Sequence, residues 1–153
     1  MHAGEYRTTN FTPVIQAMKL YEHVDLITSN PNKFQEYKET ERKNADGTIT
    51  KIIMFRQDAL TNKIRKQAYE IYINAHMANE INVNLEPGRT EERLIRQKRA
   101  VSLCEEHLAA IQLCRKHFHL AYKKIKFWGD MTITVRDSLK AWHNSDKSRF
   151  RRN

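Results

Sequence analysis

The sequence predicts an all-α protein: an antiparallel four-helix bundle with a β-hairpin arm inserted between the first and second helices. Its 153 residues include four glycines and three prolines, too few for a loop-rich β-sandwich or a Gly-rich nucleotide-binding fold. Hydrophobic residues make up 40% of the chain, enough for one buried core. Apolar residues also recur at helical spacing in four separate stretches. We therefore expect one domain over residues 1–153.

The first helix is predicted to begin at Thr12-Pro13, after a flexible polar lead at residues 1–11. Threonine is a favoured N-cap, and proline suits the first helical position because its missing N–H would have no partner there. The apolar residues of this helix are Val14, Ala17, Met18, Tyr21 and Val24. We expect the helix to end at Ser29-Asn30-Pro31; the alternative is a short continuation through Tyr37.

Residues 37–54 predict a β-hairpin. The tetrad Asn44-Ala45-Asp46-Gly47 lies between two β-prone runs, and an Asp-Gly pair in that position is typical of a hairpin turn. We interpret the segment as a two-stranded arm that projects from the helical body. A mobile loop between helices is the alternative.

A long second helix is predicted from Gln57 to Leu85, before the stop signal Pro87-Gly88. Its buried face is predicted to contain Leu60, Ile64, Ala68, Ile71, Ala75, Ala78 and Leu85. Three further apolar residues, Ile73, Ile81 and Val83, lie off this face. A helix that is apolar on more than one face tends to be covered on both, so we expect a homo-oligomer.

The third helix is predicted to begin at Thr90, where Glu91 and Glu92 suit the positive end of the helix dipole. Its predicted apolar face contains Leu94, Val101, Cys104, Leu108, Ile111 and Phe118. The fourth helix has the clearest heptad pattern in the chain, with Ile125, Trp128, Thr132, Val135, Leu139 and Trp142 in alternating steps of 3 and 4. A single helix of about fifty residues would span roughly 75 Å, so we place a tight turn at residues 119–123.

The positive charge of the chain, +9 with a sequence pI near 9.7, is concentrated in its last quarter. Residues 1–54 have a net charge of 0, residues 55–114 of +1 and residues 115–153 of +8. This asymmetry is typical of a surface or tail that faces nucleic acid. A solvated helix face followed by a frayed basic tail at residues 147–153 is the alternative.

The candidate nucleic-acid-binding residues are basic side chains from the third helix to the C-terminus. They are Arg89, Arg93, Arg96, Arg99, Lys116, Lys123, Lys124, Lys126, Arg136, Lys140, Lys147, Arg149, Arg151 and Arg152. Such stripes neutralise phosphates and predict salt-dependent contact with the nucleic-acid backbone, with RNA or DNA as the partner. Part of the arginine stripe has an alternative role, pairing with Glu91, Glu92, Glu105 or Glu106 on a neighbouring helix or subunit.

Motifs for catalysis or metal binding are weak, and we expect neither an enzyme nor a cofactor. Cys104-x-x-His107 and Cys114-x-x-His117 each resemble half of a zinc site, but one helix holds the two halves too far apart to share a metal, and we expect no metal site. The cysteines also lie roughly 15 Å apart along that helix, so we expect reduced thiols. Arg136 and His143 fit the Arg-x4–6-His pattern of the helical ribonucleases called HEPN domains, which is the enzymatic alternative.

The N-terminal residues lack the basic and apolar regions of a secretory signal, and no run of eighteen apolar residues occurs. We therefore expect a cytoplasmic protein without membrane contact. We expect Trp128 and Trp142 to pack in the core, because both occupy heptad positions.

The order of these segments resembles the accessory variability determinant proteins of diversity-generating retroelements. More distantly it resembles the four-helix-bundle proteins encoded in intervening sequences of large ribosomal RNA. The resemblance covers roughly residues 14–146 and rests on the strings Met18-Lys19-Leu20-Tyr21, Ala78-Asn79-Glu80-Ile81, Ile125-Lys126-Phe127-Trp128 and Leu139-Lys140-Ala141-Trp142, together with the long 60–83 and 93–120 helices.

The resemblance implies a non-catalytic, basic four-helix bundle that assembles as a pentamer. It also implies binding to the reverse transcriptase of the retroelement and to its template RNA, in support of mutagenic complementary-DNA synthesis. This chain departs from the family pattern by its insertion at residues 37–54 and its Arg-rich C-terminus.

Overall fold

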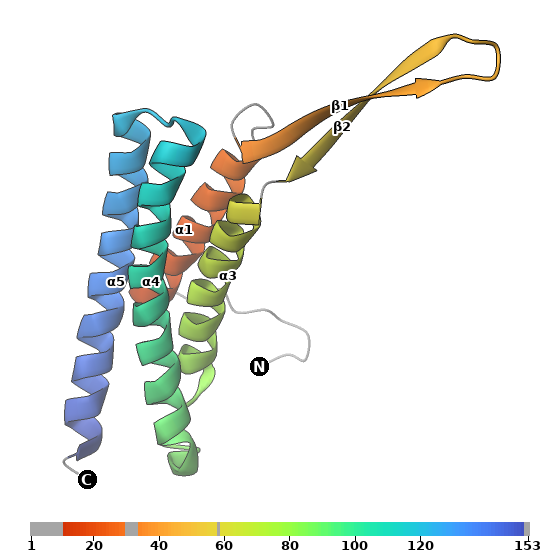
Figure 1. Ribbon diagram of the computed structural model, residues 1–153. Helices are drawn as coiled ribbons and strands as arrows, with labels where there is room; N and C mark the ends of the chain where they lie inside the picture. Colours follow the sequence, from red (N-terminus) through yellow and green to blue (C-terminus); the bar gives the residue numbers. More distant parts are fainter. Residues whose placement is uncertain (1–10, 30–33, 58, 152–153) are drawn as a thin grey trace.

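A computed structural model describes residues 11–29, 34–57 and 59–151 (Figure 1). The elements are α1 (Thr12–Thr28), β1 (Gln35–Lys43), β2 (Ile49–Gln57), α3 (Ala59–Glu80), the short 3-10 helix η1 (Pro87–Arg89), α4 (Thr90–Phe118) and α5 (Tyr122–Arg151). The four long helices run alternately up and down; α1 packs on α3, α3 on α4, α4 on α5, and α5 closes the ring against α1. This confirms the predicted four-helix bundle with a hairpin between its first two helices.

The heptad pattern of the last helix correctly predicts the side of α5 that faces the core. Its six predicted residues, from Ile125 to Trp142, are all buried. Trp128 has the largest side chain among the fully buried residues that the structure describes, and both tryptophans pack in the core as predicted. Burial of a side chain of this size contributes on the order of 2–3 kcal/mol from its apolar area alone.

Helix α3 presents small residues to the core, and this lets its neighbours approach closely. Ala68, Ala75 and Ala78 are completely buried beside Ile71. The helix ends at Glu80, five residues before the predicted boundary at Leu85, whose side chain is 78% exposed. The early end has a local cause: the Asn82 carbonyl accepts the Leu85 and Glu86 amides, while the Asn82 side chain accepts the Asn84 amide.

The start of α1 differs from the prediction by one residue. Phe11, not Thr12, is the N-cap, and its carbonyl accepts the amides of Val14 and Ile15 at 3.1 Å. Phe11 also packs edge-on against Trp142 with ring centroids 4.8 Å apart, so the last residue of the predicted flexible lead is anchored to the core. Residues 1–10 lie outside the described part of the chain. Tyr37 belongs to β1, so the alternative of a continued helix is wrong at that position.

The turn between α4 and α5 confirms the predicted boundary near residues 119–123. His119 has a φ of 53°, the left-handed conformation that commonly ends a helix. The next helix begins at Tyr122, and the Ala121 carbonyl accepts the amides of Lys124 and Ile125. At its other end α5 continues to Arg151, so the predicted basic tail at residues 147–153 is helical over its described residues.

The hairpin arm is longer than predicted. It projects from the end of the bundle where α1 stops and α3 starts, which we call the hairpin end (Figure 1). Its strands pair antiparallel from Gln35↔Gln57 to Lys43↔Ile49, where the prediction covered residues 37–54. The turn closes through the Asn44 amide, which donates to the Thr48 carbonyl at 2.8 Å. Gly47 has a φ of +88°, a conformation that explains glycine at this position.

Candidate nucleic-acid interface

The arginine stripe at the start of α4 is paired with acidic side chains of the same chain. The pairs are Arg89 with Glu86 and Glu92 at 3.2 and 2.9 Å, Arg96 with Glu92 at 3.5 Å, and Arg99 with Glu70 and Glu106, both at 3.9 Å. The hydrogen bond from Arg89 lowers the pKa of Glu92. Two of the glutamates named from sequence, Glu92 and Glu106, do pair with the stripe, but they lie on α4 itself and not on a neighbouring helix or subunit.

Arg93, the fourth member of the stripe, belongs to a buried polar cluster. Its Nε donates to Asp146 Oδ2 at 2.7 Å, and the two side chains are 13% and 6% exposed. The Arg93 guanidinium also donates to the Ile81 carbonyl and lies 5.2 Å from the centroid of the Trp142 ring. This cluster joins the end of α3 to the start of α4 and the end of α5, so Arg93 has a structural role.

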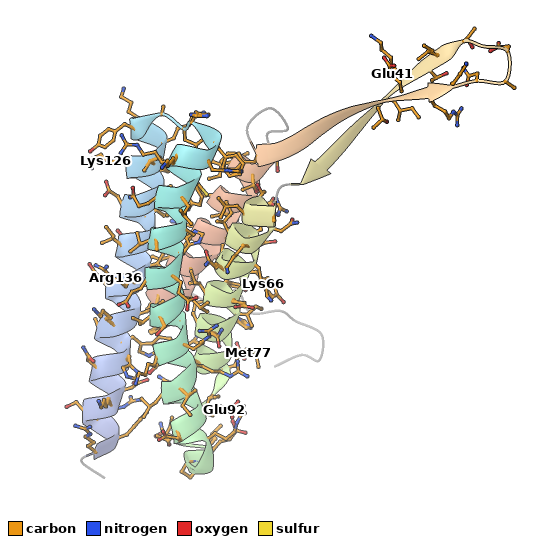
Figure 2. All side chains as sticks on the ribbon, in the orientation of Figure 1. Glu41, Lys66, Met77, Glu92, Lys126 and Arg136 are labelled. Atoms are coloured by element: carbon orange, nitrogen blue, oxygen red, sulfur yellow. The ribbon has the colours of Figure 1, made fainter. Side chains whose placement is uncertain are left out.

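The remaining predicted residues of α5 include four that pair with nearby acids. These are Lys126 with Asp130 at 2.7 Å, Arg136 with Asp137 at 3.1 Å, Lys140 with Glu105 at 4.0 Å, and Arg149 with Asp146 at 3.1 Å. The pairs of Lys126 and Lys140 are exposed, and exposed pairs contribute at most about 1 kcal/mol each. Arg149 is exposed as well, although its partner Asp146 is buried. These side chains stay available to a polyanion because a phosphate can replace such a weak partner. Figure 2 shows Lys126 and Arg136 at separate levels of α5.

Several basic side chains of α4 and α5 have no acidic partner within 4.0 Å among the described residues. They are Lys98, Arg115, Lys116, Lys123, Lys124, Lys147 and Arg151. Arg115 instead stacks on Tyr122, with 5.6 Å between its guanidinium carbon and the ring centroid. Arg152 lies outside the described residues.

These unpaired charges form two groups at opposite ends of the bundle. The first surrounds the α4–α5 turn and contains Arg115, Lys116, Lys123 and Lys124; the second contains Lys98, Lys147 and Arg151. Because a helix rises about 1.5 Å per residue, Lys124 and Lys147 lie roughly 35 Å apart along α5. The basic last quarter of the sequence is therefore spread along the whole length of the bundle, because most of it forms the single long helix α5.

His143 lies in a groove at the second of these ends. Its Nδ1 is 3.2 Å from Gln97 Oε1, and Gln97 Nε2 donates to Asp146 Oδ2 at 2.6 Å. Burial lowers the pKa of His143, and the charges of Lys147 and Lys98 lower it further. Arg136, the other residue of the ribonuclease-like pattern, lies about two turns away and donates to its neighbour Asp137.

The histidine of the first half zinc site is part of the core. His107 is completely buried, with Nδ1 3.0 Å from Gln67 Oε1 and with Nε2 accepting from Trp128 Nε1 at 3.0 Å. Burial lowers its pKa to about 4 and raises that of Cys104 to about 12. Cys104 and Cys114 are both buried and lie outside any disulfide. Within the described residues, no group of three or more His, Cys, Asp or Glu side chains is arranged to hold a metal ion.

An apolar pocket of about 370 Å³ lies at the hairpin end of the bundle. Leu26, Phe34 and Phe127 contribute to its wall, and Lys123 and Lys124 are among its lining residues. Leu26 and Phe127 are 73% and 57% exposed. This end therefore combines unpaired lysines with exposed apolar side chains. Over the described ranges, no helix has the length and apolar character needed to cross a membrane.

Comparison with protein-family models, with curated proteins and with solved structures finds no match to this chain.

Sequence reasoning missed the polar residues of this region that the structure brings together. Gln97 and Asp146 are buried hydrogen-bond partners, and Lys98 and Phe150 line the same groove as His143. One signal was present: Asp146 follows Leu139 by seven residues and so continues the heptad pattern of α5. A charged residue at a heptad position predicts a buried partner, and Arg93 supplies it.

Proposed function

We propose that this protein is a non-catalytic nucleic-acid-binding bundle that acts as an accessory to a retroelement reverse transcriptase. The observation that carries the nucleic-acid part is the distribution of unpaired basic side chains. On α1 and α3 such side chains are limited to Lys19 and Lys63 among the described residues, whereas α4 and α5 hold them at both ends. A surface with unpaired lysines and arginines along two adjacent helices attracts phosphates without reading sequence.

The polymerase part rests on the resemblance to accessory variability determinant proteins. On that basis we propose that the chain binds the reverse transcriptase and its template RNA, supports mutagenic complementary-DNA synthesis in the cytoplasm, and forms a homo-oligomer, with five subunits suggested by the resemblance. Exposed apolar residues such as Leu113, Phe127 and Ile133 are consistent with a protein partner. Ile81, which counted toward oligomerisation from sequence, is buried within the single chain and no longer supports it.

Salt-dependent binding of RNA tests the nucleic-acid part. Neutralising about four phosphates of a single strand predicts an affinity that falls about 50-fold between about 50 and 200 mM salt. Fluorescence anisotropy with a labelled single-stranded RNA measures this fall. An affinity that does not change with salt contradicts phosphate contact.

Charge reversal locates the interaction on the bundle. The double substitution Lys123→Glu/Lys124→Glu is expected to weaken RNA binding about tenfold or more, since it introduces repulsion where two lysines are unpaired. Lys63→Glu/Lys66→Glu on α3 is the matched control, with the same charge change on another helix. Equal losses in the two variants would show that α5 has no special part in binding.

Two further measurements separate this function from its alternatives. Incubation with RNA tests the ribonuclease interpretation, which gains support if cleavage occurs and is lost in His143→Ala. Light scattering gives the subunit count; a bundle that oligomerises but binds no RNA at low salt would be a purely structural interaction protein. A reverse-transcriptase gene beside the gene for this chain would support the polymerase part.

A further inference from the structure

A groove of about 530 Å³ lies between the first turns of α4 and the last turns of α5, the bundle end opposite the hairpin arm. Lys98 lines it from α4, and His143, Lys147 and Arg151 line it from α5. Figure 2 labels Glu92 at this end, on the first turn of α4. The volume falls within the range of about 300–1,000 Å³ that is usual for small-molecule sites, so it is large enough for a nucleotide.

The charge of the groove is positive. Lys98, Lys147 and Arg151 have no acidic partner within 4.0 Å among the described residues, and Glu91 is the acidic side chain in the lining. Lys98 and Lys147 line the groove from two helices together with His143, and the charges of both lysines lower the pKa of His143. A groove that gathers cations from both of its walls has the electrostatics of an anion site.

The orientation of His143 is set by groups buried behind it. Asp146 Oδ2 accepts from Gln97 Nε2, and this fixes the amide so that Gln97 Oε1 faces the imidazole. His143 Nδ1–H therefore donates to Gln97. The other ring nitrogen, Nε2, has no hydrogen-bond partner in the described part of the chain. Once protonated, Nε2 becomes a donor for an oxygen of a bound anion.

The groove also has an apolar wall. Phe150 and Ile95 line it from opposite helices, and Ile95 is 58% exposed. The Arg149 guanidinium lies 4.8 Å from the centroid of the Phe150 ring. Aromatic side chains beside cationic groups are typical of sites on which the bases of single strands stack. A paired base within a duplex does not expose its face in this way.

We propose that this groove binds one nucleotide of a single-stranded nucleic acid, with its phosphate held by Lys98, Lys147 and His143 Nε2 and its base stacked on Phe150. The inference rests on the proposed nucleic-acid function and names the site and the form of the ligand. It adds two residues, Lys98 and Phe150, that the sequence did not mark. It also assigns His143 a binding role in place of a catalytic one.

Proton uptake by His143 accompanies binding in this site. A phosphate near Nε2 stabilises the imidazolium, whereas in the free protein burial, Lys147 and Lys98 favour the neutral ring. Asp146 has the opposite effect on His143, and Arg151 and Glu91 are the other charged groups of the groove. Affinity is therefore expected to rise as the pH falls from 7.5 to 6. His143→Gln keeps a polar side chain that does not titrate, so it is expected to remove most of this rise.

Fluorescence anisotropy with a labelled eight-nucleotide oligouridine and with an RNA duplex of the same length tests the proposal on the full chain. Lys98→Glu/Lys147→Glu is expected to lower single-strand affinity at least tenfold, and Lys63→Glu/Lys66→Glu on α3 is the matched control. Phe150→Ala is expected to lower it about fivefold or more, because stacking contributes about 1–3 kcal/mol per base. Its matched control is Tyr69→Ala, an exposed aromatic residue on α3.

The outcomes separate this site from the proposed function. If wild-type protein binds oligouridine but the groove variants bind as their controls do, the groove proposal is overturned and the nucleic-acid function stands. If wild-type protein binds no RNA at low salt, both are overturned. Equal loss of duplex and single-strand binding in Phe150→Ala would overturn the stacking role. Thermal melting checks that each variant folds, and neutral Gln replacements at Lys98 and Lys147 serve if charge reversal prevents folding.

Discussion

Acidification is expected to destabilise the bundle through His107. The imidazole is completely buried between Gln67 and Trp128. Trp128 Nε1–H can only donate, so His107 Nε2 must accept, and Nδ1–H donates to the Gln67 oxygen. The ring is therefore a neutral tautomer with both nitrogens occupied. A second proton on Nε2 would break the bond to Trp128 and place a charge in the core.

The size of the effect follows from the pKa of His107, which burial lowers from 6.5 to about 4. Each pKa unit corresponds to about 1.4 kcal/mol, so the full effect is about 3 kcal/mol. The sign follows from proton binding: between pH 6.5 and 4 the unfolded chain takes up a proton on His107 that the folded chain does not. The free energy of unfolding is therefore unaffected by this residue above pH 6.5 and falls as the pH drops toward 4.

Urea unfolding at pH 7.5, 6.5, 5.5 and 4.5 measures this loss, with His107→Gln as the comparison. Glutamine can accept from Trp128 and does not titrate, so the variant lacks the His107 contribution while other titrating groups act equally in both proteins. We expect wild-type protein to lose about 2.5 kcal/mol more than the variant over this range, which stops just above the folded-state pKa. Parallel pH profiles, or an NMR titration of His107 with a midpoint near 6.5, would refute the reasoning.

Three further outcomes are expected. Asp146→Ala leaves the nearly buried Arg93 without its partner and should lower the free energy of unfolding by about 3 kcal/mol or more; urea unfolding measures this, with the exposed Asp137→Ala as control. Gly47→Ala forces a φ of +88° on alanine at a cost of about 1 kcal/mol; hydrogen exchange should show lower protection of the Asn44 amide, and an unchanged rate would contradict it. Cys104 is buried with its pKa raised to about 12, so a disulfide reagent should modify it only as fast as the chain unfolds; rapid labelling of folded protein would show that the thiol is accessible.

The contrast between α5 and α4 shows which part of the fold the sequence predicts. On α5 the core positions are apolar apart from Thr132 and Asp146, so hydrophobic spacing marks most of the buried face. On α4 the buried face includes Gln97 and His107, and a pattern search over apolar residues passes over both. The apolar pattern instead places Leu94 and Leu108 on the core face of α4, and both side chains are only half-buried. The helix was predicted correctly, while its rotation about its own axis was predicted only in part.

The candidate interface was predictable in composition and not in arrangement. The sequence marks where basic residues occur, but pairing with acids on other helices depends on tertiary structure. Arg99, for example, lies 3.9 Å from Glu70 on α3. The approach of Lys98 on α4 to Lys147 on α5 likewise depends on the turn at His119, which makes α5 run back along α4. The charge of each sequence segment can therefore be assigned to a part of the surface only when the direction of each helix is known.

The hairpin arm gives this bundle a part whose length can change independently of its core. Its strands are joined to α1 and α3 at one end, and the paired register continues to a free turn. Removing two residues from each strand would shorten the reach by about 7 Å while keeping every remaining side chain on its original face. Removing one from each would keep the pairing but exchange the faces beyond the cut. The arm is thus an adjustable spacer, at which insertions and deletions are expected to accumulate without changing the bundle itself.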